Sequence, residues 1–158
     1  SILNTLRNAR QTISEFKMKR NAVLFATGSC WEGVDFPGDL VSSLIIVTLP
    51  FSVPDPIRDY ERHSYPSLQD FIRSSVVPDM QKKLNQGFGR AIRTEQDTCV
   101  VSSLDDRANK AGRYHSDIIK ALPPCPITEQ LADVRQFLMN AKSSSYWQNE
   151  LLSAGTGT

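Results

Sequence analysis

Three short, mainly apolar runs stand out along the chain, at residues 22–26, 44–49 and 99–104. Short apolar runs bounded by polar or turn-forming residues are typical of strands covered on both faces, as the strands of parallel sheets are. Stretches with helical spacing lie between the runs. This alternation of strand and helix predicts an α/β layer fold built on a parallel sheet.

Several other stretches carry apolar residues every three or four positions, which predicts amphipathic helices. The most regular of them begins at Pro78 and Asp79, which suit a first helical turn. The helices are expected over residues 2–20, over 57–73 with a break at Pro66, and over 78–93, 108–121 and 127–141. Because the chain opens on a helix, the N-terminal strands of the sheet are expected to lie outside it.

A stiff, proline-rich segment at residues 123–126 divides the pattern in two. Consecutive prolines cannot continue a helix or a central strand. We therefore expect one domain over residues 1–124. A helical extension is expected over 125–158, with a frayed tail.

The composition is that of a globular chain. It has 158 residues, 40% of them hydrophobic and 22% charged, which excludes wholesale disorder. Basic residues number 18 and acidic residues 17, so the formal net charge is +1. Any contact with a nucleic acid must come from a local patch or from backbone amides. No apolar stretch approaches the roughly 18 residues that cross a bilayer, so no membrane partner is expected.

The three cysteines, Cys30, Cys99 and Cys125, are far apart and include no CxxC pair. A disulfide framework, a zinc site or an iron–sulfur cluster formed by this chain alone is therefore not expected. We expect each cysteine to be a small buried apolar residue. Asp105 and Asp106 could form an acidic metal-binding pair, but a helix N-terminus is favoured, since carboxylates complement the helix dipole there. No metal ligand is predicted.

The most regular predicted helix has an apolar face and a polar face. Gln86, Arg90 and Arg93 recur at i, i+4 and i+7, within about 40° of one direction and opposite the apolar residues. A guanidinium presents a planar fork that matches phosphate oxygens. Gly87 and Gly89 lie beside this row, although a glycine inside a helix costs about 1 kcal/mol relative to Ala. The row is either a solvated cationic face or a phosphate-gripping face that the glycines keep clear.

The segment that follows the first apolar run is rich in glycine. Gly28 and Gly33 have the four-residue gap of a P-loop, but Val34 and Asp35 stand where a P-loop has Lys and Ser or Thr. The segment is therefore not a triphosphate cradle by itself. It is either a simple turn or a ligand-binding loop at the carboxyl end of a parallel strand, where α/β sheets place ligands.

If this segment binds a ligand, its polar groups divide into two sets. The Ser29 hydroxyl and the free N–H groups would hold a phosphodiester. The carboxylates of Glu32 and Asp35 would hold a ribose hydroxyl or position an arginine. Trp31 either stacks on a base or packs in the core.

Together these segments resemble motifs V and VI of superfamily 2 DNA helicases, nearest to the DinG branch, which is related to XPD. The residues that carry the resemblance are FATGSCWEGVDFPGD at 25–39, LIIVTLPF at 44–51, QGFGRAIRTEQD at 86–97 and LDDR at 104–107. The two motifs occur in order, and the resemblance extends roughly from Phe16 to Pro124.

The resemblance implies the second RecA-like motor domain of an ATP-dependent DNA helicase. ATP with Mg²⁺ would bind in a cleft between this domain and a first RecA-like domain of the same protein, which supplies the P-loop lysine and the magnesium-binding acidic motif. Motifs I to IV are absent from this chain, and so are the cysteines of the family's iron–sulfur cluster. The chain alone is therefore expected to be inactive.

The resemblance also implies roles for individual residues. Arg90 and Arg93 match the arginines that reach the γ-phosphate, and Gln86 matches the motif VI glutamine. The positions assigned to nucleotide binding are Glu32, Gly33, Asp35 and Gly89. The positions assigned to single-stranded DNA are Thr27, Gly28, Ser29 and Trp31.

Two further expectations follow. The alternative to a motor domain is a phosphate-binding or single-strand-binding module without ATPase activity.

The resemblance to the DinG branch implies a bacterial cytoplasmic protein, and a nuclear one if the protein is XPD-like.

Overall fold

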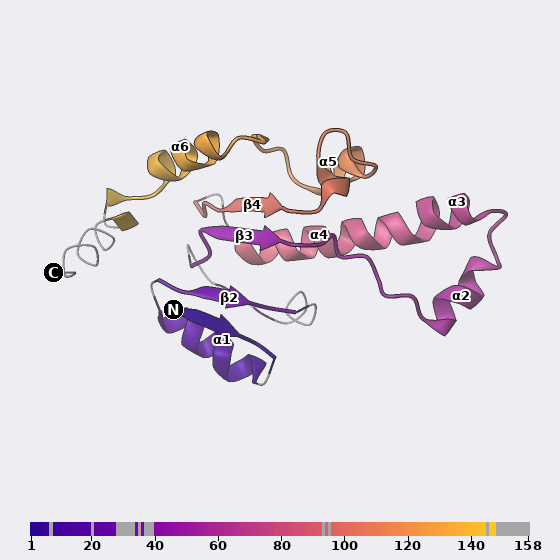
Figure 1. The fold of residues 1–158 in the computed structure, drawn as a ribbon, viewed down its shortest axis with the longest axis horizontal. Coiled ribbons are helices and arrows are strands. Elements are labelled where there is room, and N and C mark those ends of the chain that lie inside the picture. Colours follow the sequence, from indigo (N-terminus) through magenta and orange to yellow (C-terminus); the bar gives the residue numbers. More distant parts are fainter. Residues whose placement is uncertain are drawn as a thin grey trace. The chain divides into compact units, whose positions relative to one another are not determined.

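The computed structural model describes residues 1–6, 8–19, 21–27, 34, 36, 40–92, 94, 96–144 and 146–147. The chain forms two compact units, Ser1–Pro124 and Cys125–Thr158. The first unit contains all the described strands and most of the helices (Figure 1).

The described strands form two parallel pairs. Strand β1 (Ile2–Asn4) pairs with β2 (Val23–Phe25), and Leu3 stands opposite Leu24. Strand β3 (Ser43–Ile46) pairs with β4 (Val100–Ser103), and Leu44 stands opposite Val101. Parallel strands flanked by helices confirm the predicted α/β fold. All three predicted strands are present, each shorter than its apolar run, and β3 begins one residue before the predicted start.

The start of the chain differs from the prediction of a helix over residues 2–20. Residues 2–4 form β1, and helix α1 covers only Ala9–Met18, with the Asn8 side chain accepting a hydrogen bond from the Gln11 N–H as its cap. Ile2 and Leu6, which supplied part of the helical spacing, are both exposed. Pairing with β2, a contact distant in sequence, overrides the local periodicity.

Helix α4 (Val77–Ala91) packs on β3 and forms the centre of the core. Its apolar positions recur every three to four residues, so they lie on one face. The core cluster unites three residues of α4 with residues of β3, of the loop after it and of helix α5 (His115–Ala121): Ile46, Leu49, Val77, Met80, Leu84 and Ile118. Met80 is completely buried.

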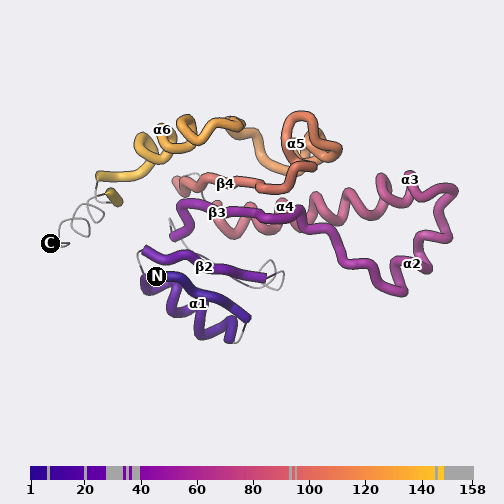
Figure 2. Tube along the Cα trace, in the orientation of Figure 1, coloured from indigo at the N-terminus to yellow at the C-terminus, as the bar shows by residue number. Residues whose placement is uncertain are grey.

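The sequence predicted that a new helix starts at Pro78, but the structure shows no helix start there. Helix α3 (Leu68–Phe71), the π-helical turn η2 (Ile72–Val76) and α4 follow without interruption as one rod (Figure 2). In the π turn the Val77 N–H donates to the Ile72 carbonyl. A proline inside a helix lacks an N–H and crowds the carbonyl four residues earlier. The wider π turn ends at Val76, two residues before Pro78, and relieves that conflict.

The other helices are short. Helix α2 (Pro56–Arg62) and α3 divide the predicted helix over 57–73, and Asp55 and Ser67 cap them. A 3-10 turn, η3 (Asp106–Ala108), follows β4. In the second unit, α6 (Leu131–Ala141) begins four residues later than predicted and has no fully buried residue.

Candidate functional site

Gln86 and Arg90 lie one turn apart on α4, on a face separate from its core residues. Gln86 is exposed and Arg90 is half-buried, whereas Met80, Leu84 and Phe88 are buried. The apolar periodicity fixes this orientation, because burying the core face turns the other side of the helix outward. The third member of the predicted row, Arg93, lies outside the described residues.

The Arg90 guanidinium has no ion-pair or hydrogen-bond partner within the described ranges. A half-buried cation in a structural role normally has one, because losing water without a partner is costly. Five N–H donors in a planar fork are therefore available to an anion with paired oxygens, such as phosphate.

Gly89 is exposed on α4, and a Cβ added there would meet nothing within 4 Å. The packing of the described residues therefore does not require a glycine at this position, although Ala would favour the helix by about 1 kcal/mol. Gly87 differs because it is buried in α4. The proposed clearance of the helix surface thus applies to Gly89 and not to Gly87.

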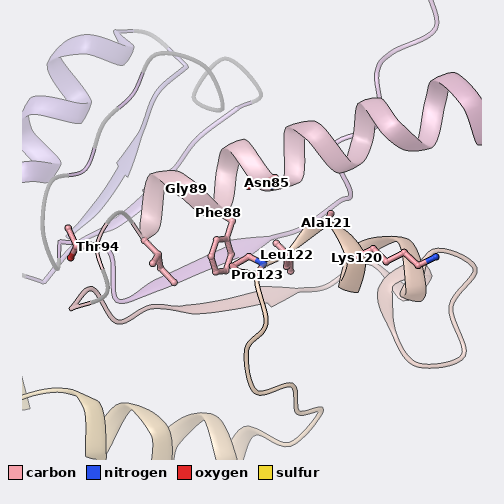
Figure 3. Close-up of a pocket in the computed structure, with 9 residues that line it drawn as sticks. Asn85, Phe88, Gly89, Thr94, Lys120, Ala121, Leu122 and Pro123 are labelled. Atoms are coloured by element: carbon pink, nitrogen blue, oxygen red, sulfur yellow. The ribbon is translucent and has the colours of Figure 1, made fainter.

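An open hollow of about 600 Å³ lies beside the C-terminal part of α4. The ring of Phe88 faces Leu122 and Pro123 across it (Figure 3). Its lining also includes the polar residues Asn85, Thr94 and Lys120 together with Gly89, Ile92 and Ala121. Arg90, the next residue after Gly89, is not among the residues that line this hollow.

The stripe that carries Gln86 and Arg90 continues toward the start of α4 through Lys83 and Asp79, at spacings of three and four residues. Asp79 Oδ2 accepts from Arg58 of α2 at 2.9 Å and lies 3.3 Å from the Lys83 ammonium. It also accepts from the Ser52 hydroxyl, which in turn accepts from Lys83.

These contacts determine the charge of Asp79. Burial raises its pKa, but the hydrogen bonds from Ser52 and Lys83 and the charges of Lys83 and Arg58 outweigh that effect. The net result is a pKa below the ordinary value of an aspartate. Sequence reasoning missed this cluster, although the i, i+4 spacing of Asp79 and Lys83 predicts their ion pair.

A second charged cluster joins the carboxyl ends of β3 and β4. Asp105 accepts from the Leu49 N–H at 2.9 Å and from two guanidinium nitrogens of Arg107, at 2.8 and 2.6 Å. It also caps η3 by accepting from the Arg107 N–H, as predicted for a carboxylate at a helix start. The Arg107 guanidinium lies 4.9 Å from the Phe51 ring centroid.

Hydrogen bonds from Arg107 lower the pKa of Asp105 far below its usual range, against the opposing effect of burial. The bond from the Leu49 N–H acts in the same direction as Arg107. Both Asp105 and Arg107 are thus satisfied by the chain itself. The cluster fixes the β4–η3 turn to the end of β3.

The glycine-rich segment after β2 is described only in part. Thr27 is exposed two residues beyond the end of β2, at the carboxyl edge of a parallel pair. The remaining predicted nucleotide-binding and DNA-binding residues of this segment lie outside the described residues: Gly28, Ser29, Trp31, Glu32, Gly33 and Asp35.

In the part of the chain that the structure describes, no group of three or more His, Cys, Asp or Glu residues could hold a metal ion. Cys99 is half-buried and Cys125 is exposed, so the prediction that each cysteine is buried is wrong for Cys125. Cys30 lies outside the described residues. None of the described helices has both the length and the apolar character that a membrane span requires.

Residues 3–125 match the family of helicase C-terminal domains (Helicase_C_2). The chain belongs to this family. It is 40% identical over 111 residues to the ATP-dependent DNA helicase DinG of Photobacterium profundum, covering 68% of this chain and 16% of that protein. It is 37% identical over 130 residues to the ATP-dependent DNA helicase YoaA of Escherichia coli, covering 81% of this chain and 20% of that protein.

A third relative is the 3'-5' exonuclease DinG of Bacillus subtilis, 34% identical over 116 residues, which make up 72% of this chain and 12% of that protein. The chain therefore spans a fifth or less of the length of these relatives. The matches confirm the resemblance noted from the motifs: this is a helicase C-terminal domain of the DinG type. The parallel pairs and flanking helices agree with a RecA-like domain.

Proposed function

We propose that this chain is the second motor domain of an ATP-dependent DNA helicase and that Arg90 acts as an arginine finger. The observation that carries the proposal is that Arg90, next to Gly89 on α4, is half-buried and has no partner among the described residues, while a Cβ at Gly89 would meet nothing within 4 Å. The names of the relatives support ATP and DNA as substrates.

In this proposal ATP binds between the chain and a companion motor domain, the RecA-like domain that carries the P-loop and the magnesium ligands. Arg90, together with Arg93, donates hydrogen bonds to the γ-phosphate as negative charge develops during transfer. Gln86, one turn before Arg90, faces the same cleft. Gly89 lets the nucleotide or the companion domain approach the helix backbone.

The glycine-rich segment completes the site in this proposal. Glu32, Gly33 and Asp35 lie near the nucleotide. Thr27, Gly28, Ser29 and Trp31 contact single-stranded DNA. The carboxyl edge of a parallel sheet, where Thr27 lies, is the usual place for ligands in α/β folds.

The deciding experiment compares Arg90→Ala with Lys82→Ala in the full-length protein. Lys82 is a matched control because it is an exposed cation on the same helix but off the stripe. Arg90→Ala should lower ATP turnover by about 10³-fold or more while ATP binding largely survives. Lys82→Ala should retain turnover. Normal turnover in Arg90→Ala would refute the arginine-finger role.

The proposal also covers the isolated chain, which should not hydrolyse ATP because it lacks a P-loop. The alternative function, a nucleic-acid-binding module without ATPase activity, predicts salt-dependent DNA binding by the chain that does not change when the P-loop domain is added. ATP turnover that requires both domains would exclude that alternative.

A further inference from the structure

Helix α2 turns two of its four charged residues inward and leaves its large apolar residues exposed. Of its seven residues, all within the described part of the chain, Arg58 and Glu61 are half-buried. Ile57 and Tyr60, one turn apart, are 80% and 81% exposed, and Val53 before the helix is 80% exposed. A surface helix normally buries its apolar residues and exposes its charges. We call Val53, Ile57 and Tyr60 the α2 face.

Hydrogen bonds explain why Arg58 and Glu61 point inward. Arg58 donates to Asp79 of α4 at 2.9 Å, and Glu61 accepts from Ser75 of η2 at 3.2 Å. Tyr65, just after α2, lies within 3.5 Å of Glu61 and packs its ring edge against Phe71. The helix is therefore held along the rod in a defined orientation, and the exposure of the α2 face follows from these specific contacts.

The composition of the α2 face favours a protein surface over a nucleic acid as its partner. It holds two aliphatic residues and one aromatic residue, and none of the three is charged. Uncharged aliphatic and aromatic groups are typical of the centre of protein interfaces. A nucleic-acid backbone would require cations, but the α2 face holds none: Arg58 is paired with Asp79, and the exposed Arg62 is not part of this face.

The position of α2 indicates which protein surface the α2 face contacts. Asp79, the anchor of Arg58, lies on the same stripe of α4 as Gln86 and Arg90. A domain that reaches Arg90 thus meets α4 on the side to which α2 is tied. The matched segment makes up only 16% and 20% of the DinG and YoaA relatives, so most of such a polypeptide is available to cover the α2 face.

We infer that the α2 face is a docking surface for the companion motor domain of the same polypeptide, against an uncharged, apolar patch of that domain. The inference rests on the proposed function, because it takes the companion domain from there. It adds a contact outside the nucleotide site. Such a contact would hold the two domains together in a defined geometry while the nucleotide changes.

The test uses the full-length protein with the photoreactive residue p-benzoylphenylalanine in place of Tyr60, of Ile57 or, as a control, of Asp59. Asp59 is exposed on the same helix but is not part of the α2 face. Illumination should link residues 60 and 57, but not 59, to a peptide of the companion domain within one polypeptide. Links between two copies, links to added single-stranded DNA, or no link at positions 57 and 60 would overturn the inference.

A mutational test gives a second measure. Replacing both Ile57 and Tyr60 with Ser should lower ATP turnover by about tenfold or more, because it removes the two large apolar side chains of α2 that would be buried at the contact. Asp59→Ser should leave turnover unchanged. Turnover equal to wild type in the double variant would also contradict the inference. The proposed function is judged separately, by the loss of turnover in Arg90→Ala.

Discussion

Two arginines of this domain stand in opposite situations. Arg107, after β4, is held by two bonds to Asp105 and lies over the Phe51 ring. Arg90, near the end of α4, is half-buried and has no partner among the described residues. The Arg107 guanidinium is thus paired within the chain, whereas no described residue pairs with Arg90. In the proposed function, a guanidinium therefore serves structure at one place and binds the γ-phosphate at the other.

Glycines mark the same difference. A Cβ at Gly112 would collide with the backbone of Arg107 and approach the Asp106 carbonyl to 2.8 Å. A Cβ at Gly89 would meet nothing within 4 Å. The first glycine is required by the fold. The fold does not require a glycine at position 89, so we look for the reason in what approaches the helix there.

Arg90→Ala is expected to give the largest effect, a loss of ATP turnover, and so to separate the end of α4 from the turn around Arg107. This variant should lower ATP turnover by about 10³-fold or more yet leave the thermal unfolding of the chain nearly unchanged, because no described contact is lost. Turnover by the full-length protein and calorimetry of the chain measure the two quantities. A large fall in stability would show that Arg90 has a structural partner and would weaken the comparison.

Gly112→Ala should have the largest effect on stability. The added methyl group must displace the backbone of the η3 turn, and overpacking of this kind costs about 3 kcal/mol. Urea unfolding of the chain should show a lower midpoint with an unchanged slope. A midpoint equal to that of the parent chain would mean that the turn adapts at little cost and that Gly112 is not required.

Asp105→Asn should cost about 2 kcal/mol, because it removes the charge-assisted bonds to Arg107. Asp105 has a lowered pKa in the folded chain. Its contribution is therefore complete above the unfolded pKa of about 4 and is lost as the pH falls below that value. Unfolding free energies measured between pH 3 and pH 7 should converge for the parent chain and Asp105→Asn toward the acid end. A constant difference between them would contradict this assignment.

The elements that the sequence predicted correctly are those with a strong local pattern. The apolar runs at 22–26, 44–49 and 99–104 became β2, β3 and β4, and the periodicity after Pro78 became α4. Residues 2–4 were assigned to a helix, because their apolar spacing fits one, and the pairing with β2 that makes them a strand is not local.

The other differences have two causes, a local π turn and contacts between distant segments. Pro78 has the sequence signature of a helix start, and a π turn that lets a helix run through a proline has no recognised signature. The Gln86 and Arg90 stripe could be predicted from spacing alone. Its continuation into Asp79, Ser52 and Arg58 could not, since Ser52 and Arg58 come from segments brought to α4 by the fold. The inverted packing of α2 depends on the same contacts.

The smallest effect is expected for Gly89→Ala, which separates chain stability from ATP turnover. Gly89→Ala adds a methyl group in open space on a helix, so it should stabilise the chain by up to about 1 kcal/mol. If a nucleotide or the companion domain approaches Gly89 closely, the same methyl group should lower ATP turnover by about tenfold or more, because small misplacements of reacting groups are costly. The control is Lys82→Ala, at a position that is also exposed on α4, and it should leave turnover unchanged. Unfolding of the chain and turnover of the full-length protein must move in opposite directions for Gly89→Ala. A gain in stability with normal turnover would mean that nothing approaches Gly89, and Arg90 would then lose the open neighbour on which its proposed role depends.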